Sequence, residues 1–434
     1  MASLSVFENL KKKDHKQQLS ELRQLPSNAL VGIVGQEDVL SRLDAKADSI
    51  IYLYVIVERC QRKPSFHDTV QHLDHFVDHF DAAQIRGALP KFNLIGDVLL
   101  QWTKLGLNPI YAIRLLSKAI KRIQPAPGYL TALHAPLFRI ALTARRPHAA
   151  LSLLEESVTN ISVKDTGVKV VNFLLYAYYG GMLFALMKRY DEALLLFQQA
   201  ITTPAESASS IQVAASKKHT LISLIHRGTE TKLPQYVSNT VVRISKYSSV
   251  IYKEITDVFA ARNMSGFNEL INVHKDSLEV DGNYGLALQL PAAMRRFAII
   301  KLTRVYANMS LERIASEVGL QNAAEAEQVI LGMIDAGDIR ATITRQDGSN
   351  VKGSVRFHEA TPVTGLPAIE VDLARVATQI QHMAKLSEQM REEELSIICK
   401  KQYLERHVQS SDNMDEIDYM TGGYSSMLDR SNFM

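Results

Sequence analysis

A histidine cluster holds the side chains in this sequence that are best suited to chemistry. It occupies residues 67–79, where imidazoles and carboxylates alternate with apolar residues: His67, Asp68, His72, Asp74, His75, Asp78 and His79. His72, His75 and His79 lie at helical spacing on one face, and imidazoles so placed can hold zinc. No HExxH motif, and no His-x-His with a downstream aspartate, supports a metallohydrolase. The favoured interpretation is a solvated polar face, with a zinc enzyme as the alternative.

Other catalytic and nucleotide-binding motifs are also missing from the sequence. Gly180-Gly181 has no lysine after it and lies within a helical pattern, so close helix packing explains it better than phosphate binding. There is no Walker motif, no GxSxG and no GxGxxG. We therefore predict that the chain is not an enzyme and has no catalytic residue, no metal site, no cofactor and no small-molecule substrate.

A basic stretch is the second candidate site. It carries a local charge of +4 from four side chains: Arg295, Arg296, Lys301 and Arg304. Most such runs are solvated helix faces. The sharper hypothesis is that this stretch binds an acidic partner or a polyanion. Replacing Arg295 and Arg296 by Glu should then weaken assembly, and more so at low salt.

The elements around the basic stretch predict a winged helix over residues 295–359. Apolar spacing and glycine stops predict three helices, at residues 297–305, 311–318 and 323–336. Ser310 is a suitable N-cap, and Asn322 with Glu325 has capping-box spacing. Alternation over residues 339–344, an Asp-Gly turn at 347–348 and a returning strand around Val355 and Phe357 predict a β-hairpin.

The charge of this winged helix argues against nucleic acid. The charged residues between 310 and 337 are Glu312, Arg313, Glu317, Glu325, Glu327 and Asp335, which sum to −4. A helix that reads DNA needs cationic or amide side chains toward the groove, and phosphates repel carboxylates. Protein contact is therefore the favoured role. The predicted strands, with Ile339, Ala341, Ile343, Val355 and Phe357, have an exposed edge that can template pairing with another chain.

Composition fits a large protein of a reducing compartment. The 434 residues carry a net charge of +3, too small to imply a nucleic-acid or membrane partner, and only Cys60 and Cys399 as cysteines. The N-terminal residues show no secretory signal. Residues 170–187 are uncharged, but a mid-segment Asn, several Tyr and a Gly pair favour a buried helix over a membrane span.

Most of the chain before Phe297 reads as helices joined by short turns. Early helices are expected at residues 49–60, 81–105 and 108–123. The clearest repeat spans residues 173–204 and matches the tetratricopeptide pattern at five positions: Gly181, Phe184, Ala193, Phe197 and Ala200. Partial copies of the pattern recur at irregular separations, which predicts an α-solenoid.

A long C-terminal helix is expected after a Pro- and Gly-containing linker. The linker covers residues 361–367, the helix 368–408, and a polar, mildly acidic tail 409–434 that we expect to be disordered. Six apolar residues form a heptad seam along the helix, which Ser387 and Glu394 interrupt: Leu373, Val376, Ile380, Met383, Met390 and Ile397. Such a seam needs a partner in cis or in trans.

A helical solenoid capped by a winged helix resembles the PCI family, which is shared by the proteasome lid, the signalosome and a translation initiation factor. Within it the chain is most similar to a subunit of the COP-nine signalosome, over roughly residues 90–390. The residues that carry the resemblance are 178–182, 200–205, 233–234, Tyr236, Leu270, Val273, His274, 302–303, Leu311, 314–315, Val318 and 324–334.

The resemblance implies a non-catalytic scaffold in the cytoplasm and nucleus. Its complex removes a ubiquitin-like modifier from cullins with a metalloprotease on another subunit. Partners would be other PCI subunits, met through the winged-helix sheet and a C-terminal helical bundle. The alternative is a lid or initiation-factor PCI subunit that contacts RNA.

The predicted fold is therefore mostly α: a TPR-like solenoid, a winged-helix PCI domain with a small β-hairpin, and a long C-terminal helix. The expected boundaries are 1–200 for the helical repeats and 201–360 for the PCI domain, divided into a helical part (201–294) and the winged helix (295–359).

Overall fold

The structure is a computed structural model of the 434-residue chain. It describes residues 4–26, 30, 33–34, 37–62, 67–156, 158–345, 353–358 and 366–400. The chain divides into two compact units, residues 1–359 and 360–434. The expected turn at residues 347–348 and the acidic tail at 409–434 lie outside the described residues.

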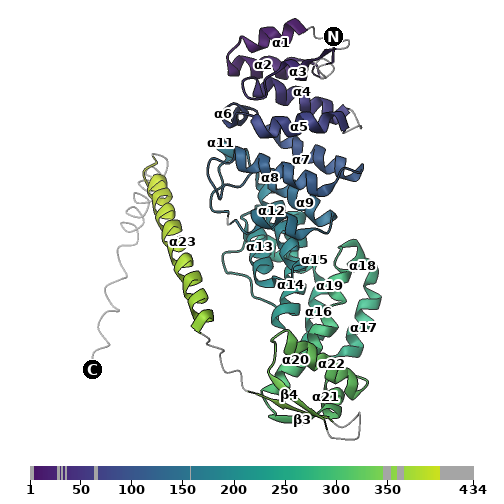
Figure 1. The fold of residues 1–434 in the computed structure, drawn as a ribbon. Coiled ribbons are helices and arrows are strands. Elements are labelled where there is room, and N and C mark those ends of the chain that lie inside the picture. The colour runs from purple at the N-terminus through teal and green to yellow at the C-terminus, as the bar shows by residue number, and fades with distance from the viewer. Residues whose placement is uncertain are drawn as a thin grey trace, which may run out of the picture. The chain divides into compact units, whose positions relative to one another are not determined.

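Helices that follow one another along the chain build the first unit (Figure 1). The first half contains α1 (Leu4–Lys11), α2 (His15–Gln24), α3 (Val39–Arg42), α4 (Ser49–Arg62), α5 (His67–His79), α6 (Ala82–Ile85), α7 (Leu89–Lys104), α8 (Pro109–Ile123), α9 (His134–Thr143), α10 (Leu151–Leu154) and α11 (Val163–Thr166). Strands β1 (Ile33–Val34) and β2 (Glu37–Asp38) pair between α2 and α3. The second half contains α12 (Val170–Leu186), α13 (Tyr190–Thr202), α14 (Ser210–Arg227), α15 (Asn239–Ser248), α16 (Val250–Ala261), α17 (Met264–Val273), α18 (Lys275–Val280), α19 (Tyr284–Ala287), α20 (Leu290–Thr303), α21 (Leu311–Val318) and α22 (Ala323–Asp335).

Two of the three expected early helices are confirmed, and the third is wrong. Helices α4 and α8 cover the predicted ranges, with the Asn108 side chain capping α8. The predicted helix at 81–105 is instead α6, a 3-10 turn over Arg86–Ala88 and then α7. Pro90 lies in the first turn of α7, where its missing N–H has no intrahelical partner to lose. The proline therefore starts a new helix.

Helices α12 and α13 form the tetratricopeptide-like pair that the sequence predicted. A Cβ atom added at Gly181 would lie 2.9 Å from two ring atoms of Phe197, and one at Gly180 would lie 2.8 Å from Leu196 Cδ1. The glycines therefore let the helices approach more closely than side chains would allow. Because Ala177, Gly181 and other residues of α12 are buried, this is the core helix expected at residues 170–187. Within the described residues, no helix is long and apolar enough to cross a membrane.

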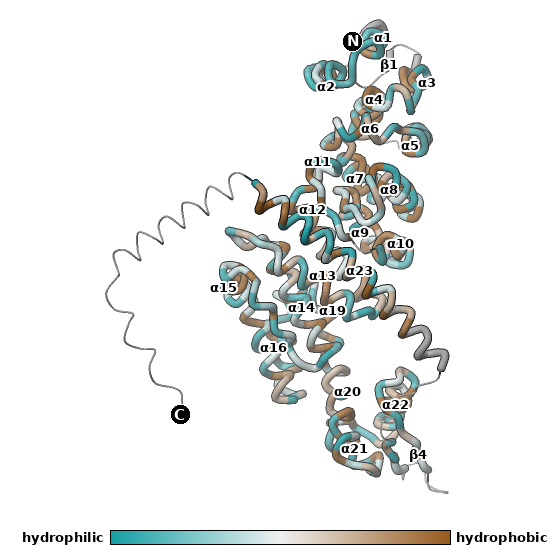
Figure 2. Tube along the Cα trace, turned by 90° about the vertical axis from the view of Figure 1, so that its left-hand side faces the viewer, coloured by the Kyte–Doolittle hydropathy of each residue, from teal (hydrophilic) through white to brown (hydrophobic). Residues whose placement is uncertain are grey.

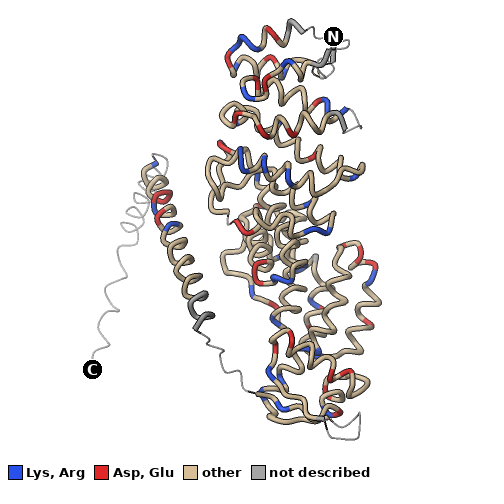
Figure 3. The backbone as a smooth tube through the Cα atoms, viewed as in Figure 1, with Lys and Arg blue, Asp and Glu red and all other residues tan. Residues whose placement is uncertain are grey.

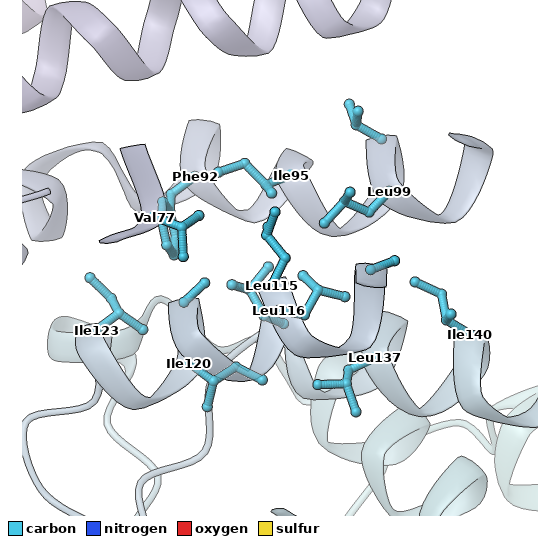
Figure 4. Packing of buried hydrophobic residues seen from close by; sticks show 14 of the residues in the cluster. Val77, Phe92, Ile95, Leu99, Leu115, Leu116, Ile120, Ile123, Leu137 and Ile140 are labelled. Atoms are coloured by element: carbon cyan, nitrogen blue, oxygen red, sulfur yellow. The ribbon is translucent and has the colours of Figure 1, made fainter. Parts of the chain in front are cut away.

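Three hydrophobic clusters lie in chain order within the first unit. The first is the largest and runs from α1 to α15; Figure 4 shows the part in which side chains of α7, α8 and α9 interdigitate. The second joins α14, α16, α17, α18, α19 and α20. The third is the core of the winged helix and begins at Ile299. Each cluster buries the apolar faces of neighbouring helices, as a solenoid requires.

A buried polar network fixes the α18–α19 turn against α14. The Lys218 ammonium donates to Asn283 Oδ1 at 2.6 Å, and Asn283 Nδ2 donates to Tyr252 Oη at 2.6 Å. Tyr252 in turn donates to Asp281 Oδ2 at 2.8 Å, which also pairs with Lys217. Burial lowers the pKa of Lys218 to about 8. The network links the helical repeats to the helices that precede the winged helix.

The predicted winged helix is present and holds one strand more than expected. Strands β3 (Asn308–Ser310), β4 (Ala341–Arg345) and β5 (Gly353–Phe357) form an antiparallel sheet in the order β3-β5-β4. Strand β3 was missed because three residues are too few to show alternation. Helix α20 begins at Leu290, so the predicted boundary at residue 295 falls inside a helix.

Of the two helix caps predicted in the winged helix, the one at α21 is confirmed and the one at α22 is wrong. Ser310 caps α21 by accepting from the Arg313 N–H, and Gly319 ends the helix at φ +74°. The capping box at α22 is wrong, because the structure shows no side-chain cap from Asn322. Glu325 Oε2 instead accepts from the Gln321 N–H at 3.0 Å.

The second unit contains helix α23, Leu366–Ile398. It begins two residues before the predicted start at 368, within the expected linker, and Pro367 is its second residue. A proline is tolerated in the first turn for the same reason as in α7. In the described part, the helix ends at Ile398 and not at residue 408, and residues 401–434 lie outside the description.

Candidate partner-binding surfaces

The winged-helix sheet presents strand edges rather than apolar side chains. Ile339, Val355 and Phe357 are no more than 7% exposed and belong to the core of the winged helix. Ala341 and Ile343 are half-buried and pack against the same core. The predicted role of the first three as partner contacts is therefore corrected, since their side chains are already covered.

What remains available on the sheet is the backbone of its outer strands. Residue pairs Ala341–Phe357 and Ile343–Val355 join β4 to β5, and among the described residues β4 has no strand on its other side. An edge strand carries unpaired N–H and C=O groups that can pair with a strand of another chain. The sheet thus offers a backbone template, with the exposed Thr342 and Thr344 beside it.

Helix α23 presents the predicted heptad seam to solvent. The exposed fractions of its apolar side chains are 62% for Leu373, 49% for Val376, 63% for Ile380, 67% for Met383, 73% for Met390 and 48% for Ile397. Along the helix in Figure 2, brown hydrophobic segments alternate with teal hydrophilic ones. Apolar rows of this kind are typical of helices that associate with other helices.

The basic stretch is not one surface, because two of its members are used inside the winged-helix region. Arg296 Nη2 forms an ion pair with Asp338 Oδ1 at 2.7 Å, and its guanidinium lies 5.4 Å from the Phe297 ring. Arg295 Nη1 lies 3.7 Å from Glu325 Oε1, at the start of α22. Replacing both arginines by Glu would therefore disturb the winged helix itself. The substitution is not a clean test of partner binding.

The other two members of the stretch are exposed. Lys301 and Arg304 lie on α20 and at its C-cap. Blue and red segments occur together around α20, α21 and α22 (Figure 3). The predicted +4 patch thus reduces to two exposed cations in a region of mixed charge. A free polyanion site spanning all four residues is not what the structure shows.

The histidine cluster makes contacts within the protein. The His75 and His79 rings lie 4.4 Å apart, and His79 Nδ1 is 2.9 Å from the His75 carbonyl oxygen. His72 Nδ1 lies 3.4 Å from the Tyr52 hydroxyl. The side chains of His67 and Asp68 are not described. Within the described residues, no group of three potential ligands is gathered as a metal site would require.

A stack of helices that ends in a winged helix with strand edges defines the class of PCI proteins, and comparison of the sequence with protein families agrees. The family model of the PCI domain matches residues 270–349. A second family model, for the N-terminal helical repeats of COP9 signalosome complex subunit 3, matches residues 13–241. The second match covers more than half of the chain.

Curated relatives point to the same family. The chain is 28% identical over 396 residues to the COP9 signalosome complex subunit 3 of Drosophila melanogaster, covering 87% of each protein. It is 32% identical over 326 residues to the Arabidopsis thaliana protein of the same name, covering 74% of this chain and 73% of that protein. The chain therefore belongs to the COP9 signalosome complex subunit 3 family.

Proposed function

We propose that this chain is a non-catalytic assembly subunit of the COP9 signalosome. It would associate with other PCI subunits through the backbone edge of its winged-helix sheet and through α23. The relatives are named as subunit 3 of that complex, which supports the proposal at the level of the assembly. The metalloprotease chemistry that removes the modifier from cullins belongs, in this proposal, to another subunit, in the cytoplasm and nucleus.

The exposed heptad seam of α23 is the observation that carries the proposal. A seam of six apolar side chains, each at least 48% exposed, gains stability when a helical bundle covers it. Burial of a large apolar side chain is worth ~1.5–3 kcal/mol, so six give on the order of 10 kcal/mol before the entropic costs of association. That is enough to decide whether the subunit is retained in a complex.

Two sets of substitutions on α23 test this role. The first variant places charges on the seam with Ile380→Asp and Met383→Asp. The matched control places the same charges beside the seam with Thr378→Asp and Gln381→Asp, which are also exposed. Both variants carry the same number of aspartates in one helix, so their effects on charge and helix propensity are comparable.

The measurement is affinity purification of the tagged full-length chain from its own cells, followed by mass spectrometry. We expect the wild-type and control chains to retain other PCI subunits and one metalloprotease subunit, and the seam variant to lose them. Retention by the seam variant would show that α23 is not the anchor. Recovery of the wild-type chain alone, or with ribosomes, would contradict the assembly role itself.

A further inference from the structure

A groove beside the winged helix includes Arg295 and Lys301 of the basic stretch and is separate from the strand edge and the α23 seam. It has a volume of about 440 Å³ and lies between α20, the loop that joins α16 to α17, and the end of α21. Its lining includes Arg262 and Met264 from the loop side, Lys301 and Val305 from the α20 side, and Glu317 from α21. All of these elements belong to the first unit, so the groove is formed within one compact body.

The charge of the groove is positive and in part unpaired. Its lining holds three cations, Arg262, Arg295 and Lys301, against the single carboxylate of Glu317. Arg295 shares its charge with Glu325 at 3.7 Å. Arg262 and Lys301 are exposed, and in the part of the chain that the structure describes neither forms an ion pair. Two free cations at one groove favour ligands with carboxylate or phosphate groups.

The lining of the groove is also partly apolar. Met264, Leu302 and Val305 line it, and the Val305 side chain is 65% exposed. Exposed apolar surface next to fixed charges is typical of protein contacts, where the apolar area supplies affinity and the charges supply register. A bare polyanion would leave these apolar side chains uncovered and would meet Glu317. An acidic polypeptide can satisfy both parts.

We propose that this groove binds an acidic segment of a partner polypeptide. Its carboxylates would lie at Arg262 and Lys301, and its aliphatic or aromatic side chains would cover Met264, Leu302 and Val305. The inference rests on the proposed assembly function, because it supplies a docking site for a further chain of the complex. It also gives a role to Lys301, one of the two exposed members of the basic stretch, whereas Arg295 and Arg296 pair with carboxylates of the same chain.

Arg262 allows an unusually clean substitution. It caps α16 at φ +56°, in the left-handed region that favours glycine. Arg262→Gly therefore removes the charge without straining the backbone. Arg145 offers a matched control, because it is exposed and has φ +52° at the end of α9. Arg145→Gly makes the same chemical change at the same backbone conformation, in residues that do not line the groove.

The probe is a labelled synthetic peptide in which Asp and Glu alternate with Leu and Phe, and binding to the full-length chain is followed by fluorescence anisotropy. Arg262→Gly and Lys301→Gln should each weaken binding by about fivefold, the value of a favourable exposed ion pair. Glu317→Gln should strengthen it, because the like charge is gone. Arg145→Gly should change nothing. Added salt should weaken binding, since exposed charges are screened beyond ~8 Å at physiological ionic strength.

Three further ligands separate the proposal from its competitors. The same peptide with Asn and Gln in place of the acids should bind poorly, and polyglutamate or a short RNA should bind more weakly than the amphipathic acidic peptide. Stronger binding of RNA, or no binding of the acidic peptide by the wild-type chain, would overturn the inference. So would equal effects of Arg262→Gly and Arg145→Gly.

The failure of this inference can be told apart from failure of the assembly role. Loss of subunits from the α23 seam variant is measured without any peptide. If the wild-type chain retains its complex but ignores the acidic peptide, the groove proposal alone falls. If the chain purifies alone yet binds the peptide with the predicted signs, the groove stands and the assembly role falls.

Discussion

At the scale of single residues, two buried histidines make the stability of the first unit depend on pH. His219 lies on α14 and is 3% exposed, and burial lowers its pKa to about 4. His134 on α9 is 1% exposed, and burial lowers its pKa to about 4 as well. An unfolded histidine titrates near pH 6.5. Between these values the unfolded chain binds more protons than the folded chain, so the free energy of unfolding falls as the pH falls from about 6.5 toward 4.

A substitution at His219 tests that response. His219→Leu removes the titrating group and places an apolar side chain in the same buried position. The loss of stability from pH 7 to pH 5 should therefore be smaller in the variant than in the wild type. The measurement is the thermal unfolding midpoint at the two pH values. Equal losses in both chains would show that His219 is not a source of the acid sensitivity.

The sequence alone did not show which cations of the basic stretch are paired with carboxylates of the same chain. Its four cations are visible in the sequence, but the carboxylates that neutralise two of them are not adjacent. Asp338 follows α22 and Glu325 opens it, and both are far from Arg296 and Arg295 along the chain. Local charge counting therefore overstated the patch. Arg262, which does reach the groove, gave no signal because it stands alone in the sequence.

At the scale of elements, helix capping distinguishes α21 from α22. The Ser310 hydroxyl accepts from the Arg313 N–H at the start of α21, whereas no side-chain cap by Asn322 is present at α22. Ser310→Ala should destabilise the winged helix by about 1 kcal/mol. Asn322→Ala is the matched control and should cost less. Urea unfolding of the full chain, followed by hydrogen exchange of residues 308–335, makes the comparison, and a larger effect at Asn322 would contradict it.

Elements with a long, regular pattern could be predicted from the sequence, and short ones could not. Apolar spacing located α12, α13, α21 and α22, because each buries one face against a neighbour. The break between α6 and α7 was missed, although Pro90 marked it, because apolar residues continue across it. Strand β3 was missed because its three residues are too few to show alternation and because its pairing partner β5 lies in a distant part of the sequence.

At the scale of the first unit, the three hydrophobic clusters are separate, so each stabilises mainly its own part of the chain. The winged-helix core contains Ile314, which is fully buried, and it is separate from the cluster around α7, α8 and α9. Each repeat of a solenoid stabilises mainly its neighbours. Damage to one cluster should therefore spread little along the chain.

Ile314→Ala tests this locality. A buried Ile-to-Ala change costs about 2–5 kcal/mol, and we expect faster amide exchange within residues 299–357. Exchange in α7, α8 and α9 should stay slow. Ile314→Val, which costs about 0.5–1.5 kcal/mol, should produce a smaller change in the same residues. Equal acceleration along the whole first unit, measured by hydrogen exchange and mass spectrometry, would show that the unit unfolds as one body.

The sequence predicted which kinds of candidate surface are present better than it predicted which residues form each of them. The α23 seam followed from heptad spacing, and each of its six residues is at least 48% exposed. The strand residues followed from alternation, but alternation marks which side chains share a face and not whether that face is covered. Burial of Val355 and Phe357 depends on helices that approach the sheet from elsewhere in the chain. The groove could not be predicted from the sequence, because it forms only where α20, the end of α21 and the loop between α16 and α17 come together.

The order of the clusters along the chain also bears on synthesis at the ribosome. The first cluster is complete once residues up to about 242 have emerged, and the winged helix follows it. Domains fold as units, N-terminal parts first, during translation. Helix α23 comes last of the described elements. A nascent chain that stalls before residue 366 therefore has no heptad seam to offer to a partner.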